Sequence, residues 1–517
     1  MARGQGRSSV LVTLAANMGS MRVVVIGSGI VGAGAAYHLS RRGVAVTVVD
    51  GGFPGEATQA GAGIVCPWVD HPEDDDWYRL TREGARHYPG LVEELGEDIG
   101  YAKVGALLVA EDPVDLEPVR ALLRRRHAGA PEMGEVVDVP TPVELFPPLS
   151  DTLSALLVPG AARVNGRQVR DALLAAAVAR GAEIRTGTAT LTSDGQVLLH
   201  PTDDETGGTV ASRASSPAVT PGGTASVPEA GGSAAAGTAS QRVTHPGTER
   251  AETERREAAG PAAGRPGADG AAAARVGAAE PAHGRPGGTG PEAAGPGGAG
   301  TEGERAASGR RDAGGGSWRQ SAPDASSAPT MPGVCKTPTG EGVPLEADRV
   351  IVAAGAWTGE VCRPLGVELP VFPRRGQILH ATLEGVDTAW WPIILPRQGP
   401  YLLGFPDSRV VVGATVEDVG FAPRVTVGGL DEVIAAGLRV APGLASATVS
   451  ETRVGLRPVY APGPALIGPV TDRVVVATGL SAYGLTAGPF TGEIAAALVL
   501  GERPPIDITP YLPPRSS

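Results

Sequence analysis

The residues whose types and spacing point most clearly to a chemical role are three glycines in Gly27-Ser-Gly29-Ile-Val-Gly32. This segment directly follows an apolar run at 22–26. Glycines at this spacing are typical of pyrophosphate binding. The first permits a tight turn, the second lets the backbone approach the phosphates, and the third lets a helix pack closely on a strand. The backbone N–H of Ile30 would then belong to a helix N-terminus that faces the phosphates.

A carboxylate follows at the place where such a site needs one. Asp50 ends a second apolar run, 44–49, about twenty residues after the first glycine, as expected for a strand–helix–strand unit. We predict that the Asp50 carboxylate accepts hydrogen bonds from the adenosine ribose hydroxyls. Its charge would repel the 2′-phosphate of NADP, so the motif itself leaves NAD and FAD open.

Three further segments combine small residues with the ends of apolar runs, at 55–64, 349–357 and 474–489. Small residues allow the backbone to pass close to a large flat ligand. The residues predicted to contact the cofactor here are Thr58, Gly61, Gly63 and Ile64 in the first segment, Ala354, Gly355 and Trp357 in the second, and Gly479, Ala482, Gly484, Leu485 and Thr486 in the third.

At these segments the chain resembles the D-amino-acid oxidase superfamily of FAD-dependent oxidoreductases, which includes D-amino-acid dehydrogenases and the glycine and sarcosine oxidases. The segments keep the family's order over 21–200 and 345–515. Four more stretches carry the resemblance, at 164–173, 370–379, 413–421 and 455–458, the last followed by Ile467-Gly-Pro. The resemblance implies FAD as the cofactor, and a helix beginning near Thr486 that directs its positive end at the flavin.

The FAD is expected to be non-covalent. Some sarcosine oxidases attach the flavin through a cysteine near the position of Arg457, and this chain has no cysteine after Cys362. The other mode of attachment uses a histidine, and none lies between Asp50 and Ile64.

The resemblance also implies the chemistry, which is hydride transfer to the flavin from the carbon that bears the amine, followed by hydrolysis of the imine. No acid or base residue is assigned, because the flavin carries the reaction. Arg457, in Gly-Leu-Arg-Pro, matches the arginine that binds the substrate carboxylate, the alternative being a structural arginine.

Two tyrosines are further substrate candidates. Tyr483 stands where many relatives have Gly-His-Gly, so it faces the substrate or packs near the flavin ring. Tyr401 lies on a predicted strand and could reach the amine or the carboxylate, although a buried tyrosine more often serves packing and one hydrogen bond.

The predicted function is FAD-dependent oxidation of the carbon–nitrogen bond of a small amino acid, of the D-amino-acid or glycine type. Two alternatives stay open: an enzyme of the same fold that acts on a secondary amine or a 2-hydroxy acid, and a flavin-binding protein without turnover. The electron acceptor, oxygen or a quinone, is not marked by any motif.

The elements that must position these residues follow from the hydrophobic pattern. We predict strands at 22–26, 44–49, 105–110, 183–190, 347–354, 376–382, 400–404, 410–416 and 474–477, with helices at 30–42, 77–95, 167–180, 427–440 and 486–500. The expected fold class is α/β, a Rossmann-type FAD-binding domain with an α+β antiparallel-sheet substrate domain.

The predicted domains are discontinuous. Residues 21–65, 145–200, 344–375 and 453–517 would form the FAD-binding domain, and 66–144 with 376–452 the substrate domain. Residues 201–343 are rich in Gly, Ala, Pro, Ser and Thr, and we predict a disordered low-complexity insertion there that interrupts a small β-meander. Residues 1–20 are expected to be a non-conforming extension upstream of the effective start, the alternative being a short signal peptide.

The composition of the chain limits the classes of partner that it can be expected to bind. A net charge of −12 over 517 residues does not favour nucleic acid. Three cysteines without a CxxC pair indicate neither a disulfide framework nor zinc, and no metal-ligand spacing appears, so no metal is predicted. No apolar stretch approaches the ~18 residues of a membrane span. We expect a cytoplasmic enzyme, with peripheral attachment to the inner face of the membrane left open.

Overall fold

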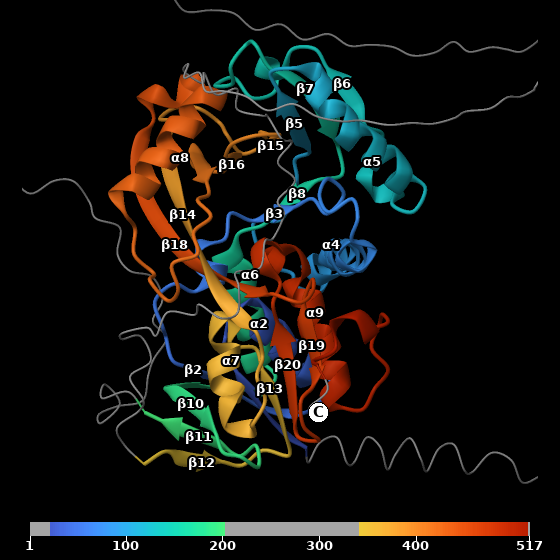
Figure 1. Cartoon of the computed structure of the whole chain (residues 1–517), viewed down its shortest axis with the longest axis vertical. Helices are drawn as coiled ribbons and strands as arrows, with labels where there is room; N and C mark the ends of the chain where they lie inside the picture. Colours follow the sequence, from blue (N-terminus) through green and yellow to red (C-terminus); the bar gives the residue numbers. More distant parts are fainter. Residues whose placement is uncertain (1–20, 202–340, 515–517) are drawn as a thin grey trace, which may run out of the picture. The chain divides into compact units, whose positions relative to one another are not determined.

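The computed structural model describes residues 21–201 and 341–514. The predicted extension at 1–20 and nearly all of the predicted insertion lie outside them. The described residues belong to one compact unit of the chain, built around two large sheets (Figure 1). No helix in the described ranges is both long and apolar enough to cross a membrane.

The first large sheet has six strands and carries the glycine motif. In spatial order its strands are β19 (Leu466–Pro469), β20 (Val474–Thr478), β13 (Arg349–Val352), β1 (Arg22–Ile26), β2 (Ala45–Asp50) and β9 (Glu183–Thr186). All neighbouring pairs are parallel except the edge pair of β19 with β20. This order is that of the predicted Rossmann-type unit.

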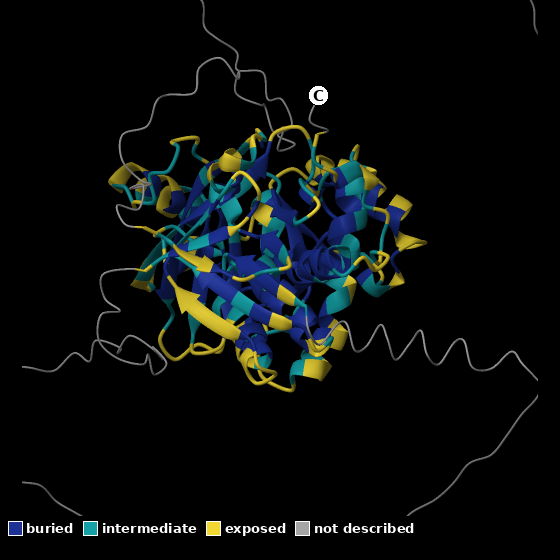
Figure 2. Cartoon of the chain, turned by 90° about the horizontal axis from the view of Figure 1, so that it is seen from below, coloured by how far each residue is buried: buried dark blue, intermediate teal, exposed yellow. Residues whose placement is uncertain are grey.

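Both faces of this sheet are covered, which explains why its strands read as continuous apolar runs. On β1, Val23 and Val25 pack in one core with the helices α2 (Ile30–Arg41), α6 (Gly166–Val178) and α9 (Gly484–Val499). Val24 and Ile26 pack in a second core on the opposite face. Figure 2 shows these buried residues in the interior and the exposed ones on peripheral loops and edges.

The second core is closed by an antiparallel meander of β10 (Thr188–Leu191), β11 (Val197–His200) and β12 (Val343–Leu345), together with α7 (Thr358–Cys362). The strands on either side of the long low-complexity segment pair with each other, Val197 opposite Leu345. The prediction that this segment interrupts a β-meander is therefore confirmed.

The second large sheet has eight strands and contains most of the predicted substrate domain. In order these are β18 (Thr448–Tyr460), β14 (Val371–Thr382), β17 (Arg409–Gly413), β16 (Tyr401–Phe405), β15 (Ile393–Pro396), β5 (Ala106–Ala110), β7 (Ser154–Val158) and β6 (Val137–Val139). It is mixed rather than purely antiparallel, because β15 pairs with β5 in parallel. Helix α8 (Val427–Val440) packs on β14 and β17.

The remaining elements connect the two sheets. A small sheet of β3 (Ile64–Val65), β8 (Ala162–Arg163) and β4 (Ala102–Lys103) lies between them in Figure 1. The other α-helices of the described residues are α3 (Ala57–Ala60), α4 (Asp75–Leu95) and α5 (Glu117–His127).

Two predictions differ from the structure in their bounds. The strand expected at 183–190 is two strands, β9 and β10, because the chain turns at Gly187 (φ 149°), where a Cβ would lie 2.7 Å from the His200 carbonyl oxygen. The expected domain boundaries at 145, 375 and 452 do not coincide with the sheets. β7 belongs to the eight-stranded sheet, and β14 and β18 each run across a predicted boundary.

Candidate cofactor and substrate site

One large cavity extends from the glycine motif to the edge of the eight-stranded sheet, with about 1570 Å³ of empty space including its solvent-open part. Most of the predicted site residues line it, namely Gly27, Gly29, Ile30, Asp50, Thr58, Gly61, Gly63, Ile64, Ala354, Gly355, Trp357, Tyr401, Arg457, Gly479, Ala482, Gly484 and Leu485. Gly32, Tyr483 and Thr486 are not among the lining residues.

The glycine motif forms the turn that the sequence predicted. Gly27 has a φ of 101°, a conformation that favours glycine, and a Cβ there would lie 2.5 Å from the Ala353 carbonyl oxygen. A Cβ at Gly32 would lie 1.9 Å from the Gly27 carbonyl oxygen, so Gly32 permits the helix to pack on the turn. At Gly29 the nearest atom to such a Cβ is 3.4 Å away, which leaves the backbone accessible from the cavity.

Helix α2 begins at this turn without a side-chain cap at Gly29 and without an acidic residue in its first turn. The Ile30 N–H donates to the Thr58 hydroxyl at 2.9 Å. Thr58 thus occupies the Ile30 N–H, which the sequence predicted to face the phosphates. The other N–H groups of the first turn and the partial positive charge of the helix N-terminus still suit an anion. The arrangement fits a pyrophosphate.

Asp50 lies at the end of β2 with its carboxylate fixed by the backbone. One oxygen accepts from the Ser28 N–H at 2.6 Å, and the other from the Gly52 N–H at 2.7 Å. Each carboxylate oxygen has more than one acceptor position. Asp50 can therefore still accept from a ribose hydroxyl while the backbone holds it in place.

The wall beside the turn is built from small residues and two aromatic rings. Gly63 has a φ of 98°, and a Cβ there would lie 1.9 Å from the Val164 carbonyl oxygen, so no side chain can be added. Trp357 stacks on Phe53 with ring centroids 5.7 Å apart, and both line the cavity. The Trp357 indole Nε1 is buried without a hydrogen-bond partner among the described residues.

A second helix N-terminus faces the same cavity. Helix α9 begins at Gly484 with no side-chain cap and no acidic residue in its first turn. Thr486 turns away from the cavity, because its hydroxyl donates to the Ile64 carbonyl oxygen at 2.9 Å, a contact that joins α9 to β3. The positive end of α9 is thus available to a group with developing negative charge.

Arg457 lies on β18 at the part of the cavity that the eight-stranded sheet lines. Its Nη1 donates to the carbonyl oxygens of Arg375, at 3.2 Å, and Thr415, at 3.0 Å. Burial lowers the pKa of Arg457, and the neighbouring Tyr401 hydroxyl opposes this shift. No carboxylate lies within ion-pair distance of Arg457 in the described ranges, although 18 arginine–carboxylate ion pairs form elsewhere in them.

The nearest acid, Glu417, is committed to other partners. It pairs with Arg375, and it accepts from the Gln377 amide and the Thr415 hydroxyl, both at 2.7 Å. Partial burial alone would raise the pKa of Glu417, but these hydrogen bonds and the Arg375 charge outweigh it and lower that pKa to about 2. Glu417 therefore stays ionised and leaves the Arg457 guanidinium available to a ligand.

The two tyrosines are placed differently. Tyr401 lies on β16 beside Arg457, and it lines the cavity. Burial raises the pKa of Tyr401, with the Arg457 charge and hydrogen bond acting against the shift, so the hydroxyl is protonated at neutral pH. Tyr483 lies beside the cavity instead. Its hydroxyl donates to Asp70 at 2.7 Å and its ring meets Trp77 edge-on, with centroids 4.2 Å apart.

Several lining residues were not predicted from the sequence, among them Phe53, Glu56, Gly187, Ala189, Gly376 and Ile378. Gly376 is a lining residue that the sequence could have indicated. It lies in the Pro370–Leu379 stretch that carries the resemblance, and a Cβ there would lie 2.3 Å from the Arg457 Nη2. This glycine makes room for the arginine head group, whereas the other residues are set by tertiary packing.

The residues present fit FAD. The cavity offers a pyrophosphate cradle at α2, a fixed carboxylate for a ribose at Asp50, and a second uncapped helix at α9. Between them the wall is built from backbone and small side chains. A large flat ligand with a phosphate bridge can thus lie between the two helix N-termini without a clash from any side chain at the glycine positions.

Comparisons with known proteins agree with this geometry. The family model described as "FAD dependent oxidoreductase" (DAO) matches residues 22–262 and 312–498. The chain is 32% identical over 501 residues to the "Uncharacterized oxidoreductase YurR" of Bacillus subtilis (strain 168), which covers 95% of this chain and 98% of that protein.

Solved and curated enzymes extend the comparison. The crystal structure of iminodiacetate oxidase (IdaA) from Chelativorans sp. BNC1 is 33% identical, has a TM-score of 0.67, and covers 95% of this chain and 99% of that one. The glycine oxidase of Pseudomonas putida (strain KT2440) is 34% identical over 177 residues, which is 34% of this chain and 47% of that enzyme. The chain therefore belongs to the DAO family of FAD-dependent oxidoreductases, and it is an enzyme that uses FAD.

Proposed function

We propose that this enzyme oxidises the carbon–nitrogen bond of a small amino acid, of the glycine or D-amino-acid type, and that Arg457 binds the substrate carboxylate. The observation that carries the proposal is a guanidinium that lies in the same cavity as the cofactor cradle and has no carboxylate partner among the described residues. A planar guanidinium can hold both carboxylate oxygens and so fix the position and the angle of the substrate.

The protein groups supply orientation and not proton transfer. Arg457 is itself held by the Arg375 and Thr415 carbonyl oxygens, which restricts its motion. The Tyr401 hydroxyl, which stays protonated at neutral pH, can donate to the same carboxylate or accept from the amine. Bound FAD supplies the hydride acceptor. The substrate carbon would lose a hydride and its nitrogen a proton to solvent, and water would then hydrolyse the imine to an oxo acid with release of ammonia.

A second candidate substrate is a secondary amine such as an N-substituted amino acid. The observation in its favour is the extent of the similarity to iminodiacetate oxidase, which spans 95% of this chain. Over that length the sequence identity is 33%, whereas a glycine oxidase structure aligned over 96% of this chain is 18% identical. Both candidate classes carry a carboxylate next to the reacting carbon, so Arg457 has the same role in each.

The experiment is an anaerobic substrate panel scored by loss of the visible flavin absorbance. Glycine and D-alanine represent primary amines, sarcosine and iminodiacetate secondary amines, and D-lactate a 2-hydroxy acid. Bleaching by either primary amine supports the first candidate, and bleaching by the secondary amines alone supports the second. Bleaching by lactate alone, or no bleaching by any member of a wider panel, would reject both and favour the 2-hydroxy-acid or the non-catalytic alternative.

The electron acceptor is tested on the same samples. Admission of air to the bleached enzyme restores the flavin colour within turnover times if oxygen is the acceptor. A soluble quinone does so under anaerobic conditions if the enzyme is a dehydrogenase. The two results assign oxidase or dehydrogenase activity directly.

A further inference from the structure

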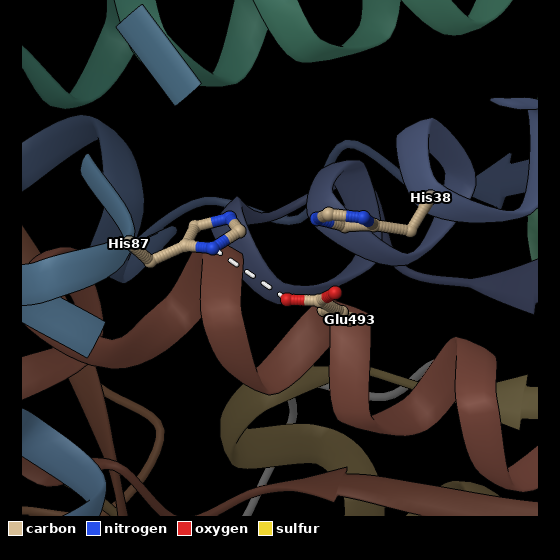
Figure 3. Close-up of side chains that lie close together, drawn as sticks. All are labelled: His38, His87 and Glu493. Atoms are coloured by element: carbon tan, nitrogen blue, oxygen red, sulfur yellow. Dashed lines mark ion pairs between the residues drawn. The ribbon is translucent and has the colours of Figure 1, made fainter. Parts of the chain in front are cut away.

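Three helices of the nucleotide-binding sheet bring two histidines and a glutamate together away from the cavity (Figure 3). His38 comes from α2, His87 from α4 and Glu493 from α9. One ligand atom of each lies within 4.8 Å of the others, and the His87 Nδ1 is 3.5 Å from a Glu493 carboxylate oxygen. Figure 3 shows the two imidazole rings across a gap, with the carboxylate reaching up from α9.

The polar atoms of this cluster are incompletely satisfied. The Nε2 atoms of His38 and His87 are both buried and have no hydrogen-bond partner among the described residues. His38 is 3% exposed. A buried polar atom without a partner costs about 1–3 kcal/mol. An ion coordinated by the His38 Nε2 would satisfy that atom, whereas His87 faces Glu493 through its Nδ1, so the same ion does not account for the His87 Nε2.

The protonation state of the rings suits metal binding. Burial lowers the pKa of His38 to about 2, with the charges of His87, Arg42 and Arg41 acting in the same direction. Burial likewise lowers the pKa of His87 to about 4. Both imidazoles are therefore neutral at pH 7, which is the form that coordinates a metal.

The charges around the cluster are of both signs. Arg41 and Arg42, whose charges lower the His38 pKa, are paired with Glu94 and Glu502, the acids that raise the pKa of Glu493. The side chains of His87 and Glu493 are 16% and 26% exposed, which leaves a path from solvent to the cluster. The ion would thus meet two neutral rings and one carboxylate.

We propose that His38, His87 and Glu493 form a binding site for a divalent transition-metal ion, with Zn²⁺ as its natural occupant. Two imidazoles and one carboxylate, with water in the fourth position, are a ligand set that zinc uses. Tetrahedral zinc with bonds of about 2.0–2.2 Å needs ligand atoms about 3.4 Å apart. The His87 Nδ1 and the Glu493 carboxylate oxygen, 3.5 Å apart, already have this spacing, and the ligand atoms of all three residues lie within 4.8 Å of one another.

The proposed role is structural. His38 lies eight positions after Ile30 on α2, which places the ion ~12 Å from the phosphate cradle at a rise of 1.5 Å per residue. Glu493 is similarly distant from the start of α9. The ion would cross-link the helices whose N-termini face the FAD site, and so hold the two termini at a fixed separation.

The test uses the FAD-loaded enzyme, stripped with EDTA, exposed to Zn²⁺ and desalted. We expect one zinc ion per chain in the wild type, measured by elemental analysis, and a rise in melting temperature on zinc addition. In His87→Gln and Glu493→Gln we expect zinc binding to be at least about 100-fold weaker. Loss of a residue that only hydrogen-bonds to a metal ligand already lowers metal affinity by about 10–100-fold. His127→Gln, an exposed histidine at the end of α5, is the matched control and keeps the zinc.

Two results would overturn the proposal: equal zinc content in the wild type and both ligand variants, or a wild type that retains no zinc after desalting. Glu493→Gln preserves shape and hydrogen bonding, so it keeps the test valid if a histidine variant fails to fold. The readouts do not depend on turnover, and the result is therefore independent of the proposed substrate.

Discussion

The role proposed for Arg457 can be tested by comparing Arg457→Ala with Arg457→Lys. The alanine variant removes the charge, whereas the lysine variant keeps a charge but loses the planar fork. The wild-type side chain is held by two backbone carbonyl oxygens and has no acidic partner in the described part of the chain. Its charge is therefore free for a substrate, and the effects should appear in substrate binding and not in cofactor binding.

The magnitude follows from the contacts that are lost. A bidentate pair consists of two charge-assisted hydrogen bonds, each contributing about 1.5–3 kcal/mol. Taking the lower figure for both, Arg457→Ala should cost about 3 kcal/mol, or about 100-fold in kcat/KM. Arg457→Lys, which can keep one contact, should cost about half of that, or roughly 10-fold.

The assay is anaerobic stopped-flow reduction of the flavin, with the best substrate of the panel, at increasing concentration. Flavin content and melting temperature are measured on the same preparations. The matched control is Arg424→Ala, an exposed arginine after β17 that does not line the cavity. We expect this control to have wild-type kcat/KM.

The reasoning would be refuted if Arg457→Ala kept its flavin and lost less than about 3-fold in kcat/KM. Loss of the flavin in Arg457→Ala together with full activity in Arg457→Lys would also refute it. That pair of results would mean that the side chain serves only to hold the Arg375 and Thr415 carbonyl groups.

Three other predictions follow. Gly32→Ala places a Cβ 1.9 Å from the Gly27 carbonyl oxygen. We therefore expect this variant to be about 1–3 kcal/mol less stable and to lose flavin on gel filtration. A variant that keeps all of its flavin would contradict this. Tyr483→Phe leaves Asp70 without its donor and should lower stability by about 1 kcal/mol in urea with unchanged flavin reduction, whereas slower reduction would indicate a substrate contact. The pKa of Glu417 falls from 4.5 to about 2 on folding, so ionised Glu417 stabilises the folded protein above pH 4.5, and this stabilisation is lost as the pH drops towards 2. In Glu417→Gln the midpoint of urea unfolding should therefore vary less with pH over that range.

The nucleotide-binding unit could be predicted from the sequence because its signals are local. Strand β1, helix α2 and strand β2 each follow from a short run of residues, and the structure has them within one or two positions. The strand predicted at 183–190 failed for a tertiary reason. Its two halves pair with different partners, β9 with β2 and β10 with β11, and no local pattern reveals this.

The candidate site was predictable where a backbone conformation requires a particular residue type. The predicted glycines and Arg457 belong to short motifs, and all of them except Gly32 line the cavity. The direction of a side chain within a motif was not predictable. Thr486 bonds to Ile64, and Tyr483 to Asp70, partners that are remote in the sequence.

The histidine–glutamate cluster could not be predicted from the spacing of residues along the sequence. We predicted no metal because no short spacing of ligands occurs along the chain. His38, His87 and Glu493 lie on three separate helices and meet only because α2, α4 and α9 pack together. Such a site becomes visible only when the helix packing is known.

The meander of β10, β11 and β12 has a consequence for how the protein folds. Val197 and Leu345 are paired neighbours, although residues 198–344 separate them along the chain. Folding slows as contacting residues lie farther apart in sequence, since the ends of a longer segment must find each other. The β11–β12 pair should therefore form later than the neighbouring β10–β11 pair, whose strands are close in the sequence. Replacing 201–342 with a two-residue turn would make the same contact local and speed refolding, without removing any strand pair of the enzyme.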